Sequence, residues 1–280
     1  MKNLGYYNGK VGEFEEMSIP MGDRSHFFGD GVYDATYSRN YHIHSLDEHI
    51  DRLYNSAKLL RIDVGMTKDE MKAILNENVK KMDTGDNFVY FQITRGTGTR
   101  NHVFPGADVK SNFWINISPK GLYDNSKKVR LMTKEDTRFY HCNIKTINLL
   151  PSVIASQEAK EHDCYETVFH RGDRVTECAH SNVHILKDGA FITAPADELI
   201  LPGITRKHLI ENCHKLGIPV KEIPYTVNEL MNADEIIVSS AGTLCAAAYE
   251  VDGRAVGGKA PELLEKLQKV MMDDFMRETE

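Results

Sequence analysis

Long apolar runs and an excess of positive charge are missing from this sequence of 280 residues. No window approaches about 18 consecutive uncharged apolar residues, so we expect no membrane span. The formal net charge of -7 provides no basic surface of the kind that binds nucleic acid. The first ten residues lack the apolar core and cleavage site of a signal peptide. We therefore expect neither a membrane nor a nucleic acid as a partner.

Paired cysteines are missing as well. The five cysteines lie far apart and form no C-x-x-C pair. An odd, scattered set argues against a disulfide framework and favours a reducing compartment, so we expect a cytoplasmic protein. His42 and His44 alternate along a predicted strand, and no cysteine or carboxylate lies at a metal-ligand spacing from them. We expect no metal site.

What is present indicates a globular α+β protein made of two α/β domains. Hydrophobic residues make up 41% and charged residues 27% of the chain, as in soluble folded proteins. The polar segment 118–128 contains Pro, Gly, Asp and Asn and marks a boundary. We predict a smaller N-terminal domain at 1–118, a linker at 119–125 and a larger C-terminal domain at 126–280.

Local signals predict the elements of the N-terminal half. Asn8-Gly9 provides the positive φ angles of a tight hairpin turn. An apolar stripe begins a helix at Leu46. Thr67 and Glu70 form a capping box at the start of the next helix, which we expect to reach Met82. The alternating segments 87–95 and 112–117 are typical of strands.

The C-terminal half mixes strands with helices. We expect strands at 128–133, 165–170, 182–187, 190–193, around 220, at 235–240 and at 246–251. We expect helices at 152–161, from Thr205 to just before Gly217, at 227–231 and at 261–276. A glycine directly after a helix is a common C-terminal cap.

A lysine stands inside an apolar run at residues 142–150, which read CNIKTINLL. A surface strand tolerates such a lysine, because its stem can lie along apolar surface while its ammonium stays in water. A buried lysine amine instead loses part of its charge and becomes a nucleophile. The run alone leaves both interpretations of Lys145 open.

Two further segments have the features of an anion site. In LPGITR (201–206) a Pro-Gly turn leads into a helix, so the amides of Ile204 and Thr205 lie at the positive end of its dipole. The loop SSAGT (239–243), with Ser240 and Ala241, offers small residues whose amides can approach a phosphate. Turn residues also precede helices that bind nothing.

Three polar side chains complete the set. Glu177 lies among small residues, either exposed at a turn or held against a ring nitrogen. Arg100 and His102 lie two residues apart on a loop, where they can converge on one carboxylate. The nearby G-x-G is not a dinucleotide motif, because Asn101 replaces the third glycine and no helix pattern follows.

Together, a lysine, a glutamate and two anion-binding loops fit pyridoxal phosphate chemistry. The lysine forms a Schiff base, the loops hold the phosphate, and the glutamate keeps the ring nitrogen protonated. The sequence also resembles the fold-type IV pyridoxal phosphate aminotransferases, and within them the branch that acts on D-amino acids. The resemblance covers nearly the whole chain and is carried by FGDGVYD (28–34), HIDRLYNSA (49–57), YFQITRGTGTRNH (90–102), IKTINLL (144–150), QEAKEHDCYE (157–166), VTE and SNV (175–183), LPGITR (201–206) and VKEIPYT (220–226).

The resemblance implies roles for individual residues. Lys145 corresponds to the lysine that forms the Schiff base and moves a proton between the substrate and the cofactor. Glu177 corresponds to the partner of the pyridine nitrogen. The implied phosphate ligands are Arg52, Ile204, Thr205, Ser240 and Ala241, and the implied ligands of the substrate carboxylate are Tyr33, Arg100 and His102. The domain at 126–280 then binds the cofactor.

The resemblance also implies an activity and an assembly. The substrates would be D-alanine, D-glutamate or D-aspartate with pyruvate or 2-oxoglutarate, in a ping-pong cycle. In this family the arginine and histidine of the carboxylate site come from the neighbouring subunit, so a homodimer is implied. The alternatives are an L-branched-chain aminotransferase, an aminodeoxychorismate lyase and a non-catalytic cofactor-binding protein.

The sequence departs from the family at two positions. His180 follows the glutamate where a serine-rich run is common, and either cofactor proximity or simple packing would explain it. Ala241 stands where the second phosphate loop usually has a threonine, so a contact there comes from the main-chain amide, with Ser240 or Thr243 as sources of a hydroxyl. The lost hydrogen bond corresponds to about 1.5–3 kcal/mol of binding free energy.

Overall fold

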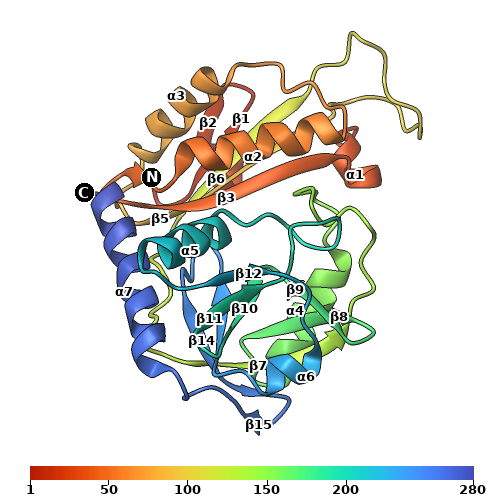
Figure 1. Cartoon of the computed structure of the whole chain (residues 1–280). Helices are drawn as coiled ribbons and strands as arrows, with labels where there is room; N and C mark the ends of the chain where they lie inside the picture. Colours follow the sequence, from red (N-terminus) through yellow and green to blue (C-terminus); the bar gives the residue numbers. More distant parts are fainter. The chain divides into compact units, whose positions relative to one another are not determined.

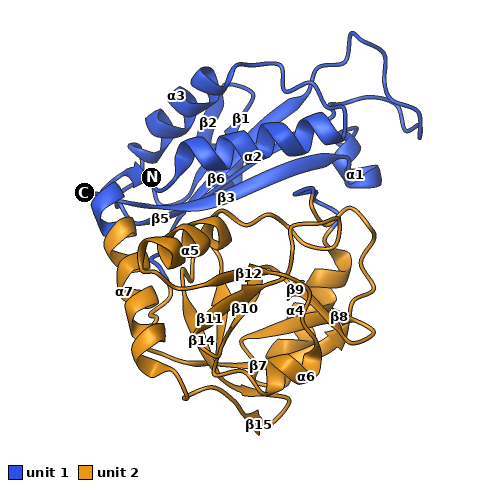
Figure 2. Cartoon of the chain, viewed as in Figure 1, with its two compact units in different colours: residues 1–122, 144–148, 276–280 blue, residues 123–143, 149–275 orange.

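The computed structural model describes all 280 residues (Figure 1). They form two compact units, each with its own sheet and helices (Figure 2). Unit 1 consists of residues 1–122, 144–148 and 276–280. Unit 2 consists of residues 123–143 and 149–275.

The boundary between the units lies inside the predicted linker, but two short segments predicted in the C-terminal domain, 144–148 and 276–280, belong to unit 1. The first of these, Ile144–Asn148, includes Lys145. Main-chain pairing places it in unit 1, because Thr146 forms a bridge with Val32 and the Tyr33 amide donates to the Lys145 carbonyl at 3.0 Å. The division into functional domains remains a prediction.

Unit 1 is built on a six-stranded antiparallel sheet with the strand order β2-β1-β6-β5-β3-β4. The strands are β1 (Leu4–Tyr7), β2 (Lys10–Glu13), β3 (Gly31–Arg39), β4 (His42–Ile43), β5 (Asn87–Thr94) and β6 (Asn112–Pro119). The predicted hairpin at Asn8-Gly9 is confirmed, since both residues have positive φ, 45° and 94°.

Two helices cover one face of this sheet (Figure 1). The helices of unit 1 are α1 (Arg24–Phe28), α2 (Leu46–Leu59) and α3 (Lys68–Val79), with the short 3-10 helix η1 (Phe14–Glu16). The predicted capping box of Thr67 and Glu70 is confirmed at the start of α3. The buried stripe of α2 packs in the same core as Val32 of β3. Because side chains alternate along a strand, Tyr33 points to the opposite face.

Unit 2 is built on a nine-stranded mixed sheet with the order β12-β11-β10-β13-β14-β7-β8-β9, and β15 pairs with β14. The strands are β7 (Val129–Glu135), β8 (Glu166–Arg171), β9 (Arg174–Cys178), β10 (Asn182–Lys187), β11 (Ala190–Thr193), β12 (Val220–Glu222), β13 (Glu235–Ser239), β14 (Ala246–Val251) and β15 (Arg254–Ala255). The helices are α4 (Leu150–Glu161), α5 (Ile204–Lys215), α6 (Val227–Met231) and α7 (Pro261–Glu278), of which the last residues belong to unit 1.

The strand β9 was not expected from the sequence, and it contains Glu177. Four of its five residues, 175–178, are buried, so the strand lacks the alternation that marks a half-exposed strand. Glu177 itself is 6% exposed. It is therefore a buried carboxylate, and the interpretation of an exposed glutamate at a turn is excluded.

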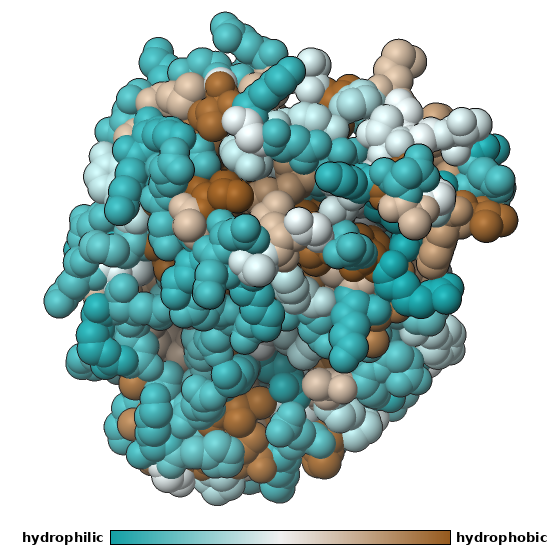
Figure 3. All heavy atoms as spheres, turned by 90° about the horizontal axis from the view of Figure 1, so that it is seen from above, coloured by the Kyte–Doolittle hydropathy of each residue, from teal (hydrophilic) through white to brown (hydrophobic).

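None of the helices combines the length and the apolar character needed to cross a membrane. The face drawn in Figure 3 is mainly hydrophilic, with apolar side chains in small separate groups.

Candidate active site

Lys145 lies beside β3 in unit 1, held there by its main chain. Its amide donates to Ser56 Oγ at 3.2 Å, in addition to the carbonyl bond to β3. Its Nζ lies 3.4 Å from the Tyr33 hydroxyl and 4.4 Å from the centre of that ring. The side chain is partly buried. The lysine and the tyrosine that were singled out from the sequence are thus in direct contact.

Tyr33 is held in turn by a second aromatic ring. Tyr90 stacks on it with ring centres 5.3 Å apart and planes 20° apart. The Tyr90 hydroxyl donates to Gln92 Oε1 at 2.6 Å. Burial, with smaller contributions from Tyr33 and Asp34, raises the pKa of Tyr90, so this phenol stays protonated. The stack leaves Tyr33 little rotational freedom.

Arg52 extends from α2 toward a buried carboxylate. Its Nε and Nη2 donate to the two oxygens of Asp34 at 2.9 and 2.8 Å. His49 Nδ1 lies 2.7 Å from the same carboxylate. Burial alone would raise the pKa of Asp34. Arg52 and His49 have the larger combined effect and hold the pKa well below its usual range. This ion pair fixes the guanidinium, and the phosphate role of Arg52 remains a proposal.

Arg100 and His102 lie on an exposed loop of unit 1. The Phe28 ring contacts both: its centre is 5.4 Å from the Arg100 guanidinium carbon and 5.1 Å from the His102 ring centre. The two side chains therefore gather around one aromatic ring. Their convergence on one substrate carboxylate remains a prediction.

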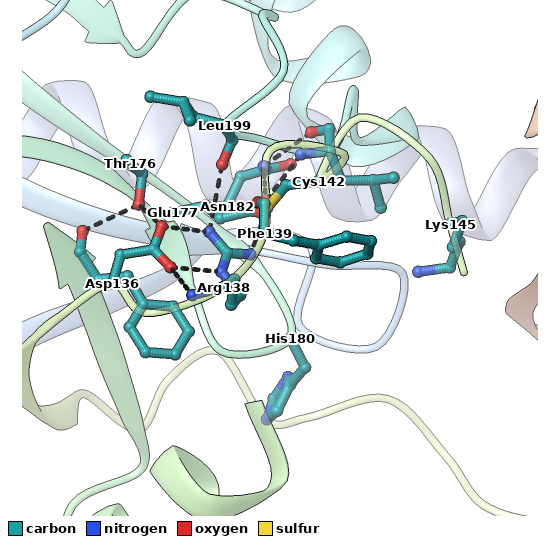
Figure 4. A network of polar contacts seen from close by, with 12 residues as sticks. Asp136, Arg138, Phe139, Cys142, Lys145, Thr176, Glu177, His180, Asn182 and Leu199 are labelled. Atoms are coloured by element: carbon teal, nitrogen blue, oxygen red, sulfur yellow. Dashed lines mark hydrogen bonds and ion pairs between the residues drawn. The ribbon is translucent and has the colours of Figure 1, made fainter. Parts of the chain in front are cut away.

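In unit 2, Glu177 is surrounded by hydrogen-bond donors (Figure 4). Arg138 Nη1 donates to its Oε1 at 2.5 Å. Asn182 Nδ2 and the Leu201 amide donate to its Oε2 at 3.1 and 3.0 Å. A carboxylate with a guanidinium and two further donors around it is favoured in its ionised form.

Arg138 connects Glu177 to a row of charges that alternate in sign. Its Nε and Nη2 donate to the two oxygens of Asp136 at 3.0 and 2.9 Å, and Arg171 Nε lies 3.3 Å from the same carboxylate. Burial would raise the pKa of Asp136, but its bonds to Arg138 and the charge of Arg171 give a net lowering. Sequence reasoning missed Arg138, since a loop arginine gives no signal of its partners.

The helix α5 offers free amides at its start. It begins at Ile204, one residue before the predicted start at Thr205, and its N-cap is Gly203, which has no side chain to bond the first-turn amides. Ile204 and Thr205 are 7% and 5% exposed. A Cβ on Gly203 would lie 2.0 Å from Asn182 Oδ1, so this position requires glycine.

Asn182 connects Glu177, the segment before α5 and the SSAGT loop. The sequence did not single out this residue. Its Nδ2 donates to the Leu201 carbonyl at 3.0 Å as well as to Glu177. Its main chain pairs with Ser239, the first residue of the SSAGT loop. In that loop Ser240 Oγ lies 2.9 Å from Thr243 Oγ1. A carboxylate, a helix N-terminus and a hydroxyl-bearing loop thus share one asparagine.

These residues fit pyridoxal phosphate by the chemistry of their donors. Main-chain amides at the start of a 12-residue helix and a hydroxyl-bearing loop suit a phosphate. An ionised buried carboxylate suits a protonated ring nitrogen, and a lysine amine suits an aldehyde. Ala241 itself contributes no hydroxyl.

His180 has a place on the surface of unit 2. Its side chain is 55% exposed, and its Nδ1 lies 3.4 Å from Glu166 Oε1. Its main-chain amide donates to the same oxygen at 2.6 Å. The imidazole therefore packs against a buried carboxylate, which accounts for its position without a cofactor contact.

Comparison with known proteins agrees with this set of residues. Residues 31–251 match the family model described as amino-transferase class IV. The chain belongs to this family. As a class IV aminotransferase, it is a pyridoxal phosphate-dependent enzyme of fold type IV, as its sequence predicted.

Several curated relatives of this class IV aminotransferase are D-alanine aminotransferases. One from Listeria monocytogenes serotype 4b is 36% identical over 276 residues, which are 96% of this chain and 95% of the relative. One from Staphylococcus haemolyticus is 35% identical over 94% of this chain and 95% of the relative. One from Bacillus licheniformis is 34% identical over 98% of this chain and 97% of the relative.

Solved structures share the fold. The branched-chain amino acid aminotransferase of Escherichia coli superposes with a TM-score of 0.88 at 24% identity, over 100% of this chain and 97% of that one. A 4-amino-4-deoxychorismate lyase from Legionella pneumophila, named as putative, gives 0.85 at 22% identity, over 93% and 97%. At these identities the likeness shows the fold, and the α+β prediction is confirmed.

Proposed function

We propose that this class IV aminotransferase moves the amino group between a D-amino acid and a 2-oxo acid. The substrates are D-alanine, D-glutamate or D-aspartate with pyruvate or 2-oxoglutarate. The similarity to D-alanine aminotransferases over 96% of the chain carries the proposal. Arg100 and His102, gathered around Phe28, support it, because this pair characterises the D-specific branch.

Lys145 is the residue we assign to the covalent attachment of the cofactor and to proton transfer at the substrate Cα. Pyridoxal phosphate, when bound, supplies an aldehyde that condenses with amines and a ring that accepts electrons from the substrate. The contact between Lys145 Nζ and the Tyr33 hydroxyl restricts the amine to one side of the Tyr33 ring. A fixed amine moves a proton along one direction only.

Glu177 is assigned to the pyridine nitrogen. Arg138 keeps the carboxylate ionised, so a shared proton resides on the nitrogen rather than on the carboxylate. The phosphate is assigned to the amides of Ile204 and Thr205 and to Arg52, with Ser240 and Ala241 in the second loop.

The substrate carboxylate is assigned to Tyr33, Arg100 and His102. Guanidinium binds carboxylate through two parallel hydrogen bonds, which fixes orientation as well as position. With the carboxylate fixed on one side, only one enantiomer presents its Cα hydrogen to the lysine. Placing the carboxylate ligands on one side therefore selects one enantiomer, and the similarity to D-alanine aminotransferases assigns it as the D-enantiomer.

We also propose a homodimer in which Arg100 and His102 serve the neighbouring subunit. An apolar stripe on α4 supports an association: Leu150, Val153 and Ile154 are 70%, 59% and 48% exposed and recur at the i, i+3 and i+4 spacing of one helix face. The five free cysteines agree with a reducing compartment, and we propose the cytoplasm.

The test is to incubate the purified protein, loaded with pyridoxal phosphate, with D-alanine and 2-oxoglutarate and to measure pyruvate. The same assay with L-alanine tests the choice of enantiomer. With L-leucine as the amino donor and its 2-oxo acid as the measured product, it tests the branched-chain alternative. Pyruvate from aminodeoxychorismate without an acceptor would indicate a lyase.

We expect turnover of D-alanine and none in Lys145→Ala. Absence of D-alanine turnover, or equal turnover of the L-enantiomer, would contradict the proposal. A protein that gains no visible absorbance with pyridoxal phosphate would contradict the cofactor assignment as well.

A further inference from the structure

Arg24, the first residue of α1, is an almost fully buried cation. It is 2% exposed, and arginines are rarely buried to this extent unless their charge is paired. Its Nε donates to Asp30 Oδ2 at 2.8 Å. The free energy cost of burying this charge is offset only if the remaining guanidinium donors also find partners.

Those partners are main-chain carbonyls of the loop that carries Arg100. We call residues 96–104 the Arg100 loop. Arg24 Nη1 donates to the carbonyl of Asn101 at 2.7 Å and lies 3.4 Å from that of Val103. These are the two residues on either side of His102. The Arg24 amide also donates to the Gly96 carbonyl at 3.0 Å, so both ends of the loop are bound.

The Phe28 ring links the same arginine to the functional side chains. The Arg24 guanidinium carbon lies 4.8 Å from the centre of this ring, while Arg100 and His102 lie 5.4 and 5.1 Å from it. A cation or an imidazole at this distance from an aromatic ring is attracted to it. One buried arginine therefore holds the loop backbone and also contacts the ring on which both side chains pack.

A second arginine, Arg95, also binds the Asp30 carboxylate, but its other donors bind the chain after α2. Arg95 Nε donates to both oxygens of Asp30, at 3.0 and 2.9 Å. Its remaining donors bind the carbonyls of Leu60 and Arg61, both at 2.9 Å, which lie after α2. It also lies over the Phe104 ring at 3.7 Å. Its hydrogen bonds thus leave the carbonyls around His102 untouched.

We infer that Arg24 is a positioning residue for substrate binding: it holds the Arg100 loop so that Arg100 and His102 meet the substrate carboxylate. This inference rests on the proposed function, which assigns that carboxylate to the two side chains. Arg24 acts through the loop and does not touch the substrate. Its loss should therefore weaken substrate binding and leave the chemistry at Lys145 intact.

The experiment compares Arg24→Lys with Arg95→Lys as a matched control. A lysine at 24 can pair with Asp30 but lacks the fork that also reaches the Asn101 and Val103 carbonyls. We expect R24K to raise KM for D-alanine about tenfold while kcat stays within about twofold, because a charge-assisted hydrogen bond to the loop is lost. R95K, which keeps a cation over Phe104, should leave KM within about twofold.

Two readouts separate positioning from general loss of stability. Backbone hydrogen exchange of residues 99–104 should become faster in R24K and not in R95K, with or without cofactor. In an Arg100→Ala background R24K should raise KM no further, because the residue through which it acts is gone. Phe28→Leu, which keeps the bonds from Arg24 to the carbonyls, should also raise KM and covers the case in which R24K does not fold.

Equal effects of R24K and R95K on KM and on exchange would overturn the inference, as would an additive effect of R24K in the R100A background. A wild-type protein that does not turn over D-alanine would overturn the proposed function instead. Hydrogen exchange would then still decide whether Arg24 holds the loop.

Discussion

Arg138 shows at the scale of one residue how the candidate site holds a buried charge. Its side chain is 10% exposed and lies between two carboxylates that are 8% and 0% exposed, those of Glu177 and Asp136. A guanidinium stays protonated at any pH at which proteins fold. The cation is therefore permanent, and it lowers the pKa of Asp136.

Replacing Arg138 by glutamine should destabilise the cofactor-free protein by about 3–5 kcal/mol, because a buried carboxylate is left without its cation. The measurement is the free energy of unfolding from urea denaturation. The double variant Arg138→Gln, Glu177→Gln should recover part of the loss, since one of the uncompensated charges is removed with it.

The control for this prediction is Arg130→Gln. Arg130 pairs with Glu250 at 2.8 Å, but its side chain is 37% exposed, so water replaces the lost partner and the destabilisation should be much smaller. A stability of R138Q equal to that of the wild type would contradict the prediction.

At the scale of elements, β10 is the strand that connects the parts of unit 2 near the assigned phosphate loops. It pairs with β11 on one side and β13 on the other. His184 in its middle bonds Thr193 of β11 through Nδ1 at 2.8 Å and Ser239 of β13 through Nε2 at 2.7 Å. Ser239 is the first residue of the SSAGT loop.

His184 should make the stability of the protein depend on pH. Burial, with a smaller contribution from the Arg206 cation, lowers the pKa of His184 from 6.5 to about 3. Between these values the unfolded chain binds a proton that the folded chain does not, so acid favours unfolding. The stabilisation from this group is complete above pH 6.5 and is lost as the pH falls toward 3.

The measurement is the free energy of unfolding at pH 7, 6 and 5 for the wild type and for His184→Gln. The wild type should lose about 1.4 kcal/mol per pH unit more than the variant below pH 6.5. Glutamine offers a donor and an acceptor but does not titrate, which makes it the matched replacement. Identical slopes for the two proteins would show that His184 does not titrate as its burial predicts.

At the scale of the whole molecule, the proposed activity requires two copies of the chain. The donors assigned to the substrate carboxylate, Arg100 and His102, would come from one subunit and Lys145 from the other. The exposed stripe of Leu150, Val153 and Ile154 on α4 is the apolar surface we assign to this association.

Replacing Leu150 and Val153 together by aspartate should convert the protein from a species of twice the 31.7 kDa chain mass into a monomer. Charged groups on a buried apolar interface are not solvated, so the association becomes unfavourable. Sedimentation measures the mass, and turnover of D-alanine should fall with dimer content. Leu216→Asp, at a leucine that is 43% exposed after α5, is the control and should leave the mass unchanged. A wild-type monomer with full activity would contradict the prediction.

Local signals allowed much of the secondary structure to be predicted. The turn at Asn8-Gly9, the capping box at Thr67 and the start of α5, predicted to within one residue, each depend on residues within one turn of each other. The strand β9 was missed for the opposite reason. Its residues are buried almost throughout, which removes the alternation that depends on one wet face.

By itself, the sequence determined which kinds of residue form the candidate site: a lysine in an apolar run, a glutamate, two anion-binding loops and an Arg-x-His pair. It also indicated the protein family. Only the tertiary structure decided what holds these residues. Arg138 reaches Glu177 across 39 positions, and Arg24 reaches the Asn101 carbonyl across 77. The placement of Lys145 beside β3 likewise depends on pairing with Val32 and Tyr33, far away in the chain. Such contacts follow from how distant elements pack and leave no periodic trace in the residues themselves.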